Sequence, residues 1–279
     1  MTSFNDRRAM SHQRYADMSD AKVSSDIREF HTKQAYPFVE RFQKNSTLLT
    51  TLGPSELHQY IYSEVDFWPG LKGEVDISGS HDKLFSPALS RGRSAVHFKG
   101  NHPIEFGSIK ELLRSTLCRK GAPVDELSRF YPSAGALYPI EVFLCRLSNH
   151  IVDWPDLGNV FRLRPNSLEL ESMESPLSPS ALLTAICGQQ PSLGQPDFAV
   201  VYTAFIDKFI FKYQYRGYRH CLMEVGSMYM LMDLKAKQLG LVNRVWSGFY
   251  DNLIADALCV DMDAVLPCVV QLFGAKDGY

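Results

Sequence analysis

A long apolar stripe in the carboxyl-terminal third of the chain constrains its fold most. Its residues recur at intervals of three and four positions: Cys221, Leu222, Val225, Met228, Tyr229, Met232, Ala236 and Leu239. This spacing places them on one side of an α-helix that begins near Tyr218. Gly240 stands where a left-handed cap would end that helix. A stripe of this length is typical of a core or subunit-interface helix, so we expect it at the centre of the fold.

Short apolar runs predict the strands that this helix would cover. Residues 198–202 are apolar throughout and too few for a helix, which predicts a strand buried in the middle of a sheet. Residues 140–145 alternate in a way that predicts a second strand. Strands at 241–246 and 265–273 would flank a helix capped by Asp251. Ser108, three residues before Glu111, has the spacing of a capping box.

Together these elements predict an α+β fold, with a mixed sheet flanked by helices and one long central helix. The segment before it differs in character, because glycine, proline and serine punctuate it from Gly53 to about Ser90. In the amino-terminal part, a helix is expected to begin near Ser24. We therefore predict that residues 1–85 form an N-terminal extension or small subdomain and that residues 86–279 form the main domain.

The composition is that of an ordinary globular protein, with 45% apolar residues, 22% charged residues and a net charge of −2. This charge balance predicts no binding to nucleic acid or to a membrane surface. The polar N-terminus and the short apolar runs indicate neither a secretion signal nor a membrane span, so a cytoplasmic protein is expected. Six scattered cysteines and eight histidines form no metal-binding pattern, and no metal site is predicted.

Three stretches are candidates for chemistry. The first, Pro132-Ser133-Ala134-Gly135, lacks the Gly-x-Ser-x-Gly pattern of a serine nucleophile. Proline and glycine would instead let the backbone approach a flat ligand, with the serine hydroxyl and the amides as hydrogen-bond partners. A plain turn before a strand is the alternative. The chain has neither the Gly-x-Gly-x-x-Gly of a dinucleotide site nor a Walker loop.

The second stretch, Phe211 to Arg219, places three tyrosines, a lysine and two arginines at the start of the long helix. Lys212 next to Tyr213 could transfer a proton, or the stretch could be a solvated basic helix entrance. The third stretch, Arg91-Gly92-Arg93-Ser94, could bind a phosphate through its guanidinium groups or could be a charged surface loop. The residues alone leave these alternatives open.

Two long runs resemble a known family. The run from Arg129 to Glu141 is similar to the Pro-Ser-x-Gly-x-Leu-Tyr-Pro motif of SagB-type dehydrogenases in the nitroreductase superfamily. The run from Phe211 to Tyr229 resembles the same family, with Arg-Gly-Tyr-Arg followed by Leu-Met-Glu-Val-Gly-Ser-Met-Tyr. Because both runs are long and occur in the family's order, the resemblance is specific. It covers residues 90–275 well.

The resemblance implies a nitroreductase-like fold that binds FMN at a homodimer interface. It implies oxidation of thiazolines and oxazolines to thiazoles and oxazoles on a microcin-type antibiotic peptide rich in Gly, Ser and Cys. Partner cyclodehydratase subunits would first form those rings. The family's catalytic pair corresponds to Lys212 and Tyr213. The family's arginine-serine element, which holds the FMN phosphate and ribityl chain, corresponds to Arg93 and Ser94, with Arg91 nearby. Further candidate FMN contacts are Pro132, Ser133, Gly135, Arg219, Ser247 and Gly248.

The chain departs from the family pattern at the phosphate clamp. Many nitroreductases carry a second arginine two residues after the clamp serine, where this chain has Val96. Lys276 is a candidate replacement cation. Two other functions remain as alternatives: a nicotinamide-dependent nitroreductase of small molecules, and a non-catalytic scaffold subunit of a peptide-modifying complex.

Overall fold

The computed structural model describes residue 15 and residues 17–34, 89–100, 102–118, 128–188 and 191–276. The chain divides into two compact units, one of residues 1–35 with 91–279 and one of residues 36–90. Every helix and strand described below belongs to the first unit. Most of the predicted 1–85 extension lies outside the described residues, so the boundary near residue 85 stays a prediction.

A six-stranded sheet forms the middle of this unit, with the strand order β5-β4-β2-β6-β8-β7. Its strands are β2 (Ile140–Arg146), β4 (Val160–Arg164), β5 (Glu169–Ser172), β6 (Phe198–Ala204), β7 (Leu241–Trp246) and β8 (Leu266–Ala275). Neighbouring strands in this sheet run antiparallel. The parallel pairing is in a separate sheet of β1 (Ile104–Glu105) and β3 (Ile151–Val152).

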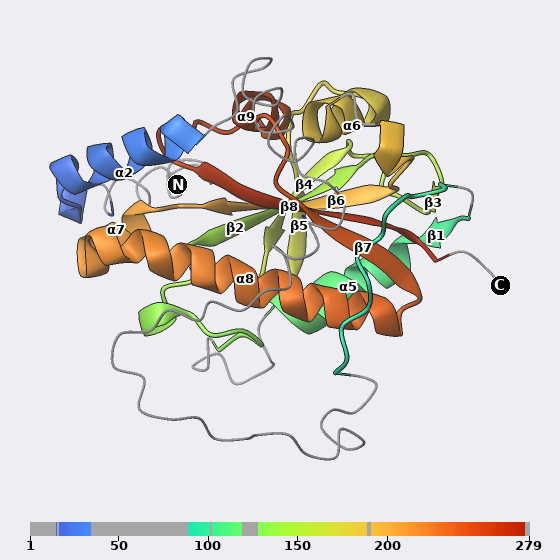
Figure 1. Cartoon of the computed structure of the whole chain (residues 1–279), viewed down its shortest axis with the longest axis horizontal. Coiled ribbons are helices and arrows are strands. Elements are labelled where there is room, and N and C mark those ends of the chain that lie inside the picture. Colours follow the sequence, from blue (N-terminus) through green and yellow to red (C-terminus); the bar gives the residue numbers. More distant parts are fainter. Residues whose placement is uncertain are drawn as a thin grey trace, which may run out of the picture. The chain divides into compact units, whose positions relative to one another are not determined.

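Helices cover both faces of the sheet (Figure 1). The helices α5 (Phe106–Leu117) and α8 (Tyr215–Gln238) pack on one face, and α6 (Pro179–Cys187) and α9 (Asp251–Leu258) pack on the other. Val142 and Leu144 of β2 therefore contact one core, while Phe143 and Cys145 contact the second. This double cover explains why β2 is buried on both faces although its sequence predicted a simple alternation.

The central elements confirm the main predictions. All seven residues of β6 are buried, as the apolar run 198–202 predicted. The long helix α8 ends before Gly240, whose φ of +70° is the left-handed conformation expected of a cap. One residue of the predicted stripe is misplaced, because Leu222 is 44% exposed whereas Cys221 and Val225 face the core.

Two predicted helix caps are wrong. The helix α5 begins at Phe106, after Glu105, so Ser108 lies inside the first turn and caps nothing. Asp251 is likewise the first residue of α9 rather than the residue that precedes it. Both helices begin earlier than the predicted capping residue implies. In α5 the reason is packing, because Phe106 is buried against the core.

The amino-terminal helix α2 (Ala21–Gln34) packs against α7 (Asp207–Tyr213) and α8. Asp207 is 4% exposed, and its carboxylate accepts hydrogen bonds from Arg28 at 2.9 Å and from Ser24 at 3.1 Å. His31 of α2 lies 3.1 Å from the hydroxyl of Tyr218. These contacts join α2 to the junction between α7 and α8, which is where the catalytic candidates lie.

Candidate functional site

A strained turn carries the first group of candidate residues. It lies just before β2 and includes a short 3-10 helix, Ala134–Ala136. Gly135, Ala136 and Tyr138 have positive φ values of 61°, 54° and 48°. The hydroxyl of Ser133 accepts a hydrogen bond from the Tyr138 amide at 2.9 Å and so closes the turn. Strained backbone of this kind is concentrated at ligand and active sites, because the surrounding structure must hold it in place.

Lys212 and Tyr213, at the end of α7, lie directly against this turn. A Cβ at Gly135 would come within 2.6 Å of the Lys212 amine and 2.8 Å of the Tyr213 hydroxyl. The two functional groups therefore meet at one point of the backbone, and a side chain there would have to displace them. The turn itself is exposed at Pro132 and Gly135, so both groups border an accessible surface.

Neighbouring side chains hold the Tyr213 ring in place. Its centroid lies 4.9 Å from that of His220 and 5.9 Å from that of Phe209. The next residue, Gln214, has a φ of +51° and separates α7 from α8. The bend at Gln214 lets the end of α7 and the start of α8 support one aromatic ring from two sides.

Glu224 is a buried carboxyl group behind the turn, and the sequence reading assigned it no role. It is 2% exposed, and neither carboxylate oxygen makes a full hydrogen bond within the described residues. Burial raises its pKa to about 7, and the Ser133 hydroxyl and the positive charges of Arg129 and Lys208 oppose that shift. The sequence could have indicated its burial, because Glu224 falls three residues after Cys221 and so lies on the buried side of α8.

The predicted phosphate clamp lies beside the other end of α8. Arg91 contacts Asp233 of α8 at 3.3 Å and donates to the hydroxyl of Ser94 at 2.8 Å. Arg93 is exposed. The backbone at Lys276 reaches the same edge, where its amide donates to the Gly240 carbonyl at 3.1 Å. Arg91, Arg93, Ser94 and Lys276 thus gather near the start of β7.

Arg244 is a further cation that the sequence reading missed. Its guanidinium donates to the Ala95 carbonyl at 3.1 Å, next to the clamp. The remaining candidates are Arg219, Ser247 and Gly248. Arg219 is exposed near the start of α8, and Ser247 and Gly248 follow β7, with Gly248 packed against the Trp246 ring.

The two groups of candidates are far apart in a single chain. Tyr213 contacts His220 near one end of α8, and Arg91 contacts Asp233 near the other. A helix rises about 1.5 Å per residue, so these two contact points are about 20 Å apart along the helix axis. Lys212, Tyr213, Ser133 and Gly135 form one group, and Arg91, Arg93, Ser94 and Lys276 form the other.

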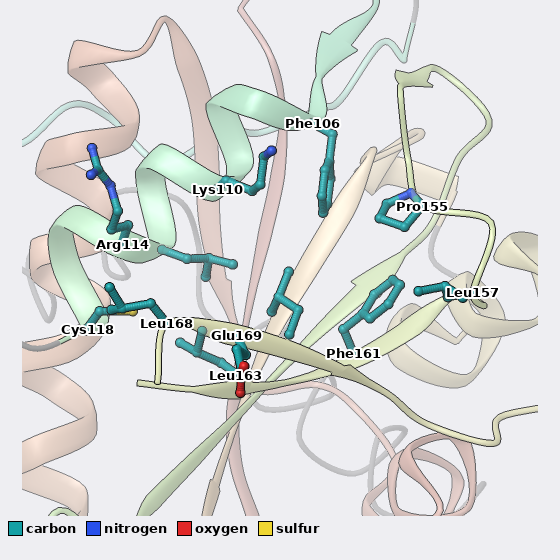
Figure 2. Close-up of a pocket in the computed structure, with 12 residues that line it drawn as sticks. Phe106, Lys110, Arg114, Cys118, Pro155, Leu157, Phe161, Leu163, Leu168 and Glu169 are labelled. Carbon is teal, nitrogen blue, oxygen red and sulfur yellow. The ribbon is translucent and has the colours of Figure 1, made fainter. Parts of the chain in front are cut away.

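An apolar cavity of about 310 Å³ lies outside both groups, between α5 and the β4–β5 hairpin. Figure 2 shows Phe106 of α5 on one side of it and Phe161 and Leu163 of β4 on the other. Within the part of the chain that the structure describes, no cluster of His, Cys, Asp and Glu could hold a metal ion. None of the described helices is long and apolar enough to span a membrane.

The fold and the motif turn place the chain in a known class. Residues 91–274 match the model of the Nitroreductase family, and the chain belongs to this family. It is 36% identical to the microcin B17-processing protein McbC of Escherichia coli. The alignment spans 258 residues and covers 92% of each protein.

The structural comparison agrees. A chain of the E. coli microcin synthetase McbBCD complex with truncated pro-MccB17 bound has a TM-score of 0.81 to this one. The two are 34% identical, and the match covers 95% of this chain and 97% of that one. The resemblance drawn from the two sequence runs is thereby confirmed.

Proposed function

We propose that this chain is an FMN-dependent azoline dehydrogenase that converts thiazolines and oxazolines to thiazoles and oxazoles on a microcin-type peptide. The observation that carries the proposal is the meeting of Lys212 and Tyr213 at Gly135, on an exposed turn of the family's motif. Similarity to McbC over 92% of both chains supports the same activity.

The reaction removes a proton and a hydride from neighbouring ring carbons. The α-carbon proton is acidified by the aromaticity that the ring gains, and it needs a base held within hydrogen-bond reach. Lys212 and Tyr213 supply two candidate groups at one place. The packed ring of Tyr213 suits a fixed acceptor or positioning group, whereas the exposed Lys212 amine can reach outward.

The residues present fit FMN. The exposed backbone at Pro132 and Gly135 offers a flat surface beside the catalytic pair, while Arg93, Ser94 and Lys276 offer donors for a phosphate. Bound FMN would supply a hydride acceptor for the second ring carbon. Ser133 also has the structural role that the alternative interpretation gave it, because its hydroxyl closes the turn before β2.

The separation of the two groups supports a homodimer. Points about 20 Å apart on α8 are too distant for one FMN to contact both within one chain. Two chains with their α8 helices antiparallel would bring the clamp of one subunit to the catalytic pair of the other. One flavin would then be shared between the subunits.

The exposed side of α8 suits such an interface. Tyr215, Leu222, Met223 and Met230 are 52%, 44%, 60% and 38% exposed and recur at helical spacing. Gly226 lies among them, and a Cβ there would meet only the Tyr229 hydroxyl, at 3.9 Å. A glycine inside a helix costs about 1 kcal/mol relative to alanine, so an open site there favours close approach by a second surface.

The natural setting would be a heteromeric synthetase. The E. coli relative of known structure belongs to the McbBCD complex with truncated pro-MccB17 bound. By analogy, this chain would act with cyclodehydratase subunits on a precursor peptide rich in Gly, Ser and Cys. The scaffold-only alternative is less favoured, since a scaffold has no need of two functional groups held against a strained turn.

Mass spectrometry of a peptide substrate tests the proposal. The FMN-loaded protein is incubated with a precursor that a cyclodehydratase has already cyclised. Each ring closure removes one water, and each oxidation by this chain should remove two further hydrogens. Loss of water without loss of hydrogen would refute the activity. Rapid nicotinamide-driven reduction of free nitroaromatics, with no action on the peptide, would favour the nitroreductase alternative.

A further inference from the structure

A polar cavity of about 370 Å³ lies at the amino-terminal end of β2. Its walls come from the motif turn at Tyr138, from the turn between β4 and β5 at Asn166 and Ser167, and from Lys208 of α7. Ligand pockets in proteins have volumes of roughly 300–1,000 Å³. The cavity is therefore large enough for a short peptide segment.

Hydrogen-bond donors dominate the walls of this cavity. The acceptor Glu141 is already engaged, because Arg162 donates to it at 2.7 Å. Arg129 is 8% exposed and stacks 4.3 Å from the centroid of the Tyr138 ring. Its Nε has no hydrogen-bond partner among the described residues. A buried positive charge is stabilised by nearby acceptors, so Arg129 in the wall favours a ligand rich in acceptors.

Lys208 connects this cavity to the catalytic pair. Its amine donates to the Tyr138 carbonyl at 3.4 Å, and burial lowers its pKa. It lies four residues before Lys212 on α7, so the two side chains project from the same side of the helix, roughly 6 Å apart. Tyr138 in turn is three residues from Gly135. The cavity thus borders the same motif turn that the Lys212 amine contacts.

The chemistry of a cyclised peptide complements a wall of donors. Ring closure expels the oxygen of the preceding carbonyl as water and converts the amide N–H of the reacting residue into a ring nitrogen that only accepts hydrogen bonds. A precursor of Gly, Ser and Cys also carries no charged side chains. Each ring that is formed therefore removes a donor from the peptide and leaves its acceptors in excess.

We infer that this cavity, given the azoline dehydrogenase activity proposed above, binds the peptide segment next to the reacting ring through its carbonyl oxygens and ring nitrogens. Arg129 and Lys208 would donate from the floor, and Asn166 and Ser167 from the rim. The subsite would then favour cyclised over linear peptide, and it would feed successive rings toward Lys212 and Tyr213.

Binding and turnover of matched peptides test this subsite. A labelled cyclised peptide and its linear precursor are titrated against the FMN-loaded full-length protein, and KM and kcat are measured for azoline oxidation. Wild-type protein should bind the cyclised form more tightly. Lys208→Met should weaken that binding and raise KM by about tenfold, the loss expected for one charge-assisted hydrogen bond. The affinity for linear peptide should change less.

A second variant guards against a folding defect. Asn166→Ala combined with Ser167→Ala changes only exposed turn residues and should weaken binding of the cyclised peptide about threefold. Lys110→Met is the matched control, because Lys110 lines the apolar cavity of Figure 2 instead. It should leave both constants unchanged.

Four results would overturn the inference. Equal affinity of wild-type protein for cyclised and linear peptides is one, and normal KM in both cavity variants is another. In either case azoline oxidation by wild-type protein would leave the proposed function intact. If wild-type protein oxidises no azoline, both proposals fail. Displacement of the peptide by inorganic phosphate alone, with no preference for cyclised peptide, would assign the cavity to an anion instead.

Discussion

The Lys212 amine lies 5.3 Å from the centroid of the Tyr213 ring, and both side chains end against the backbone of Gly135. Two neighbouring residues in a helix normally project in different directions. Here the end of α7 and the strained turn bring their functional groups together. This arrangement leads to the first two predictions.

Replacing the pair should separate binding from chemistry. Lys212→Ala combined with Tyr213→Ala should lower azoline oxidation by about 10²–10⁴-fold, the range for loss of a positioned acid or base. FMN should stay bound, and the peptide should accumulate rings that have lost water but not hydrogen. Tyr213→Phe and Lys212→Ala alone would tell which group acts. Near-normal azole formation by the double variant would contradict both assigned roles.

Gly135→Ala should damage the site locally. The new methyl group would meet the Lys212 amine and the Tyr213 hydroxyl, and alanine at a φ of +61° costs about 1–2 kcal/mol. We expect a slightly lower melting temperature and a marked loss of kcat. Gly107→Ala is the control, because nothing lies within 4 Å of its added methyl group in α5. Full activity of Gly135→Ala would show that the close approach is irrelevant.

Glu224→Gln should change how stability depends on pH. The wild-type carboxyl has a pKa of about 7 in the folded protein and about 4.5 when unfolded, so the folded state holds its proton longer. Its contribution to stability is complete below pH 4.5 and is lost as the pH rises through 7, in total about 3 kcal/mol. Glutamine does not titrate, so the variant should not lose this stability as the pH rises.

Chemical denaturation at several pH values measures this effect. The stability of Glu224→Gln relative to wild type should rise between pH 4.5 and 8. Glu174→Gln, at an exposed glutamate, should show no such rise. Parallel curves for Glu224→Gln and wild type would mean that Glu224 is charged throughout this pH range.

Gly226→Arg should break the proposed dimer and, with it, FMN binding. The arginine would project from the exposed apolar side of α8, where a second subunit would lie. Sedimentation should show a monomer that has lost its flavin absorbance. Gly226→Ala should instead remain a dimer and gain up to about 1 kcal/mol from its better helix propensity. A flavin-replete Gly226→Arg dimer would place the interface elsewhere.

Arg93→Ala should weaken FMN retention without affecting the fold. A charge-assisted contact to a phosphate contributes about 1.5–3 kcal/mol, which corresponds to an increase in Kd of roughly 10- to 100-fold. Fluorescence titration of the apoprotein with FMN measures it. Lys110→Ala, on α5, is a surface control. Unchanged affinity in Arg93→Ala would mean that Arg244 or Lys276 carries the phosphate.

Local sequence signals predicted the fold elements well where burial is periodic or continuous. The spacing of Cys221, Val225 and Met228 predicted α8, and the apolar run 198–202 predicted the central strand. Each of these signals depends on which residues are buried, and the spacing of apolar residues in the sequence indicates this directly. The helix starts at Ser108 and Asp251 were wrong, because tertiary packing outweighs a single polar cap.

By itself, then, the sequence determined the α+β class, the motif turn and the adjacent Lys212 and Tyr213. Only the tertiary structure decided that Gly135 faces this pair, that Glu224 is buried behind the motif turn, and that Arg129 and Lys208 border one cavity. It also decided that the residues predicted for the phosphate clamp and for catalysis lie near opposite ends of α8. These relationships join residues far apart in sequence, and their distances depend on how the helices pack across the sheet rather than on any local pattern.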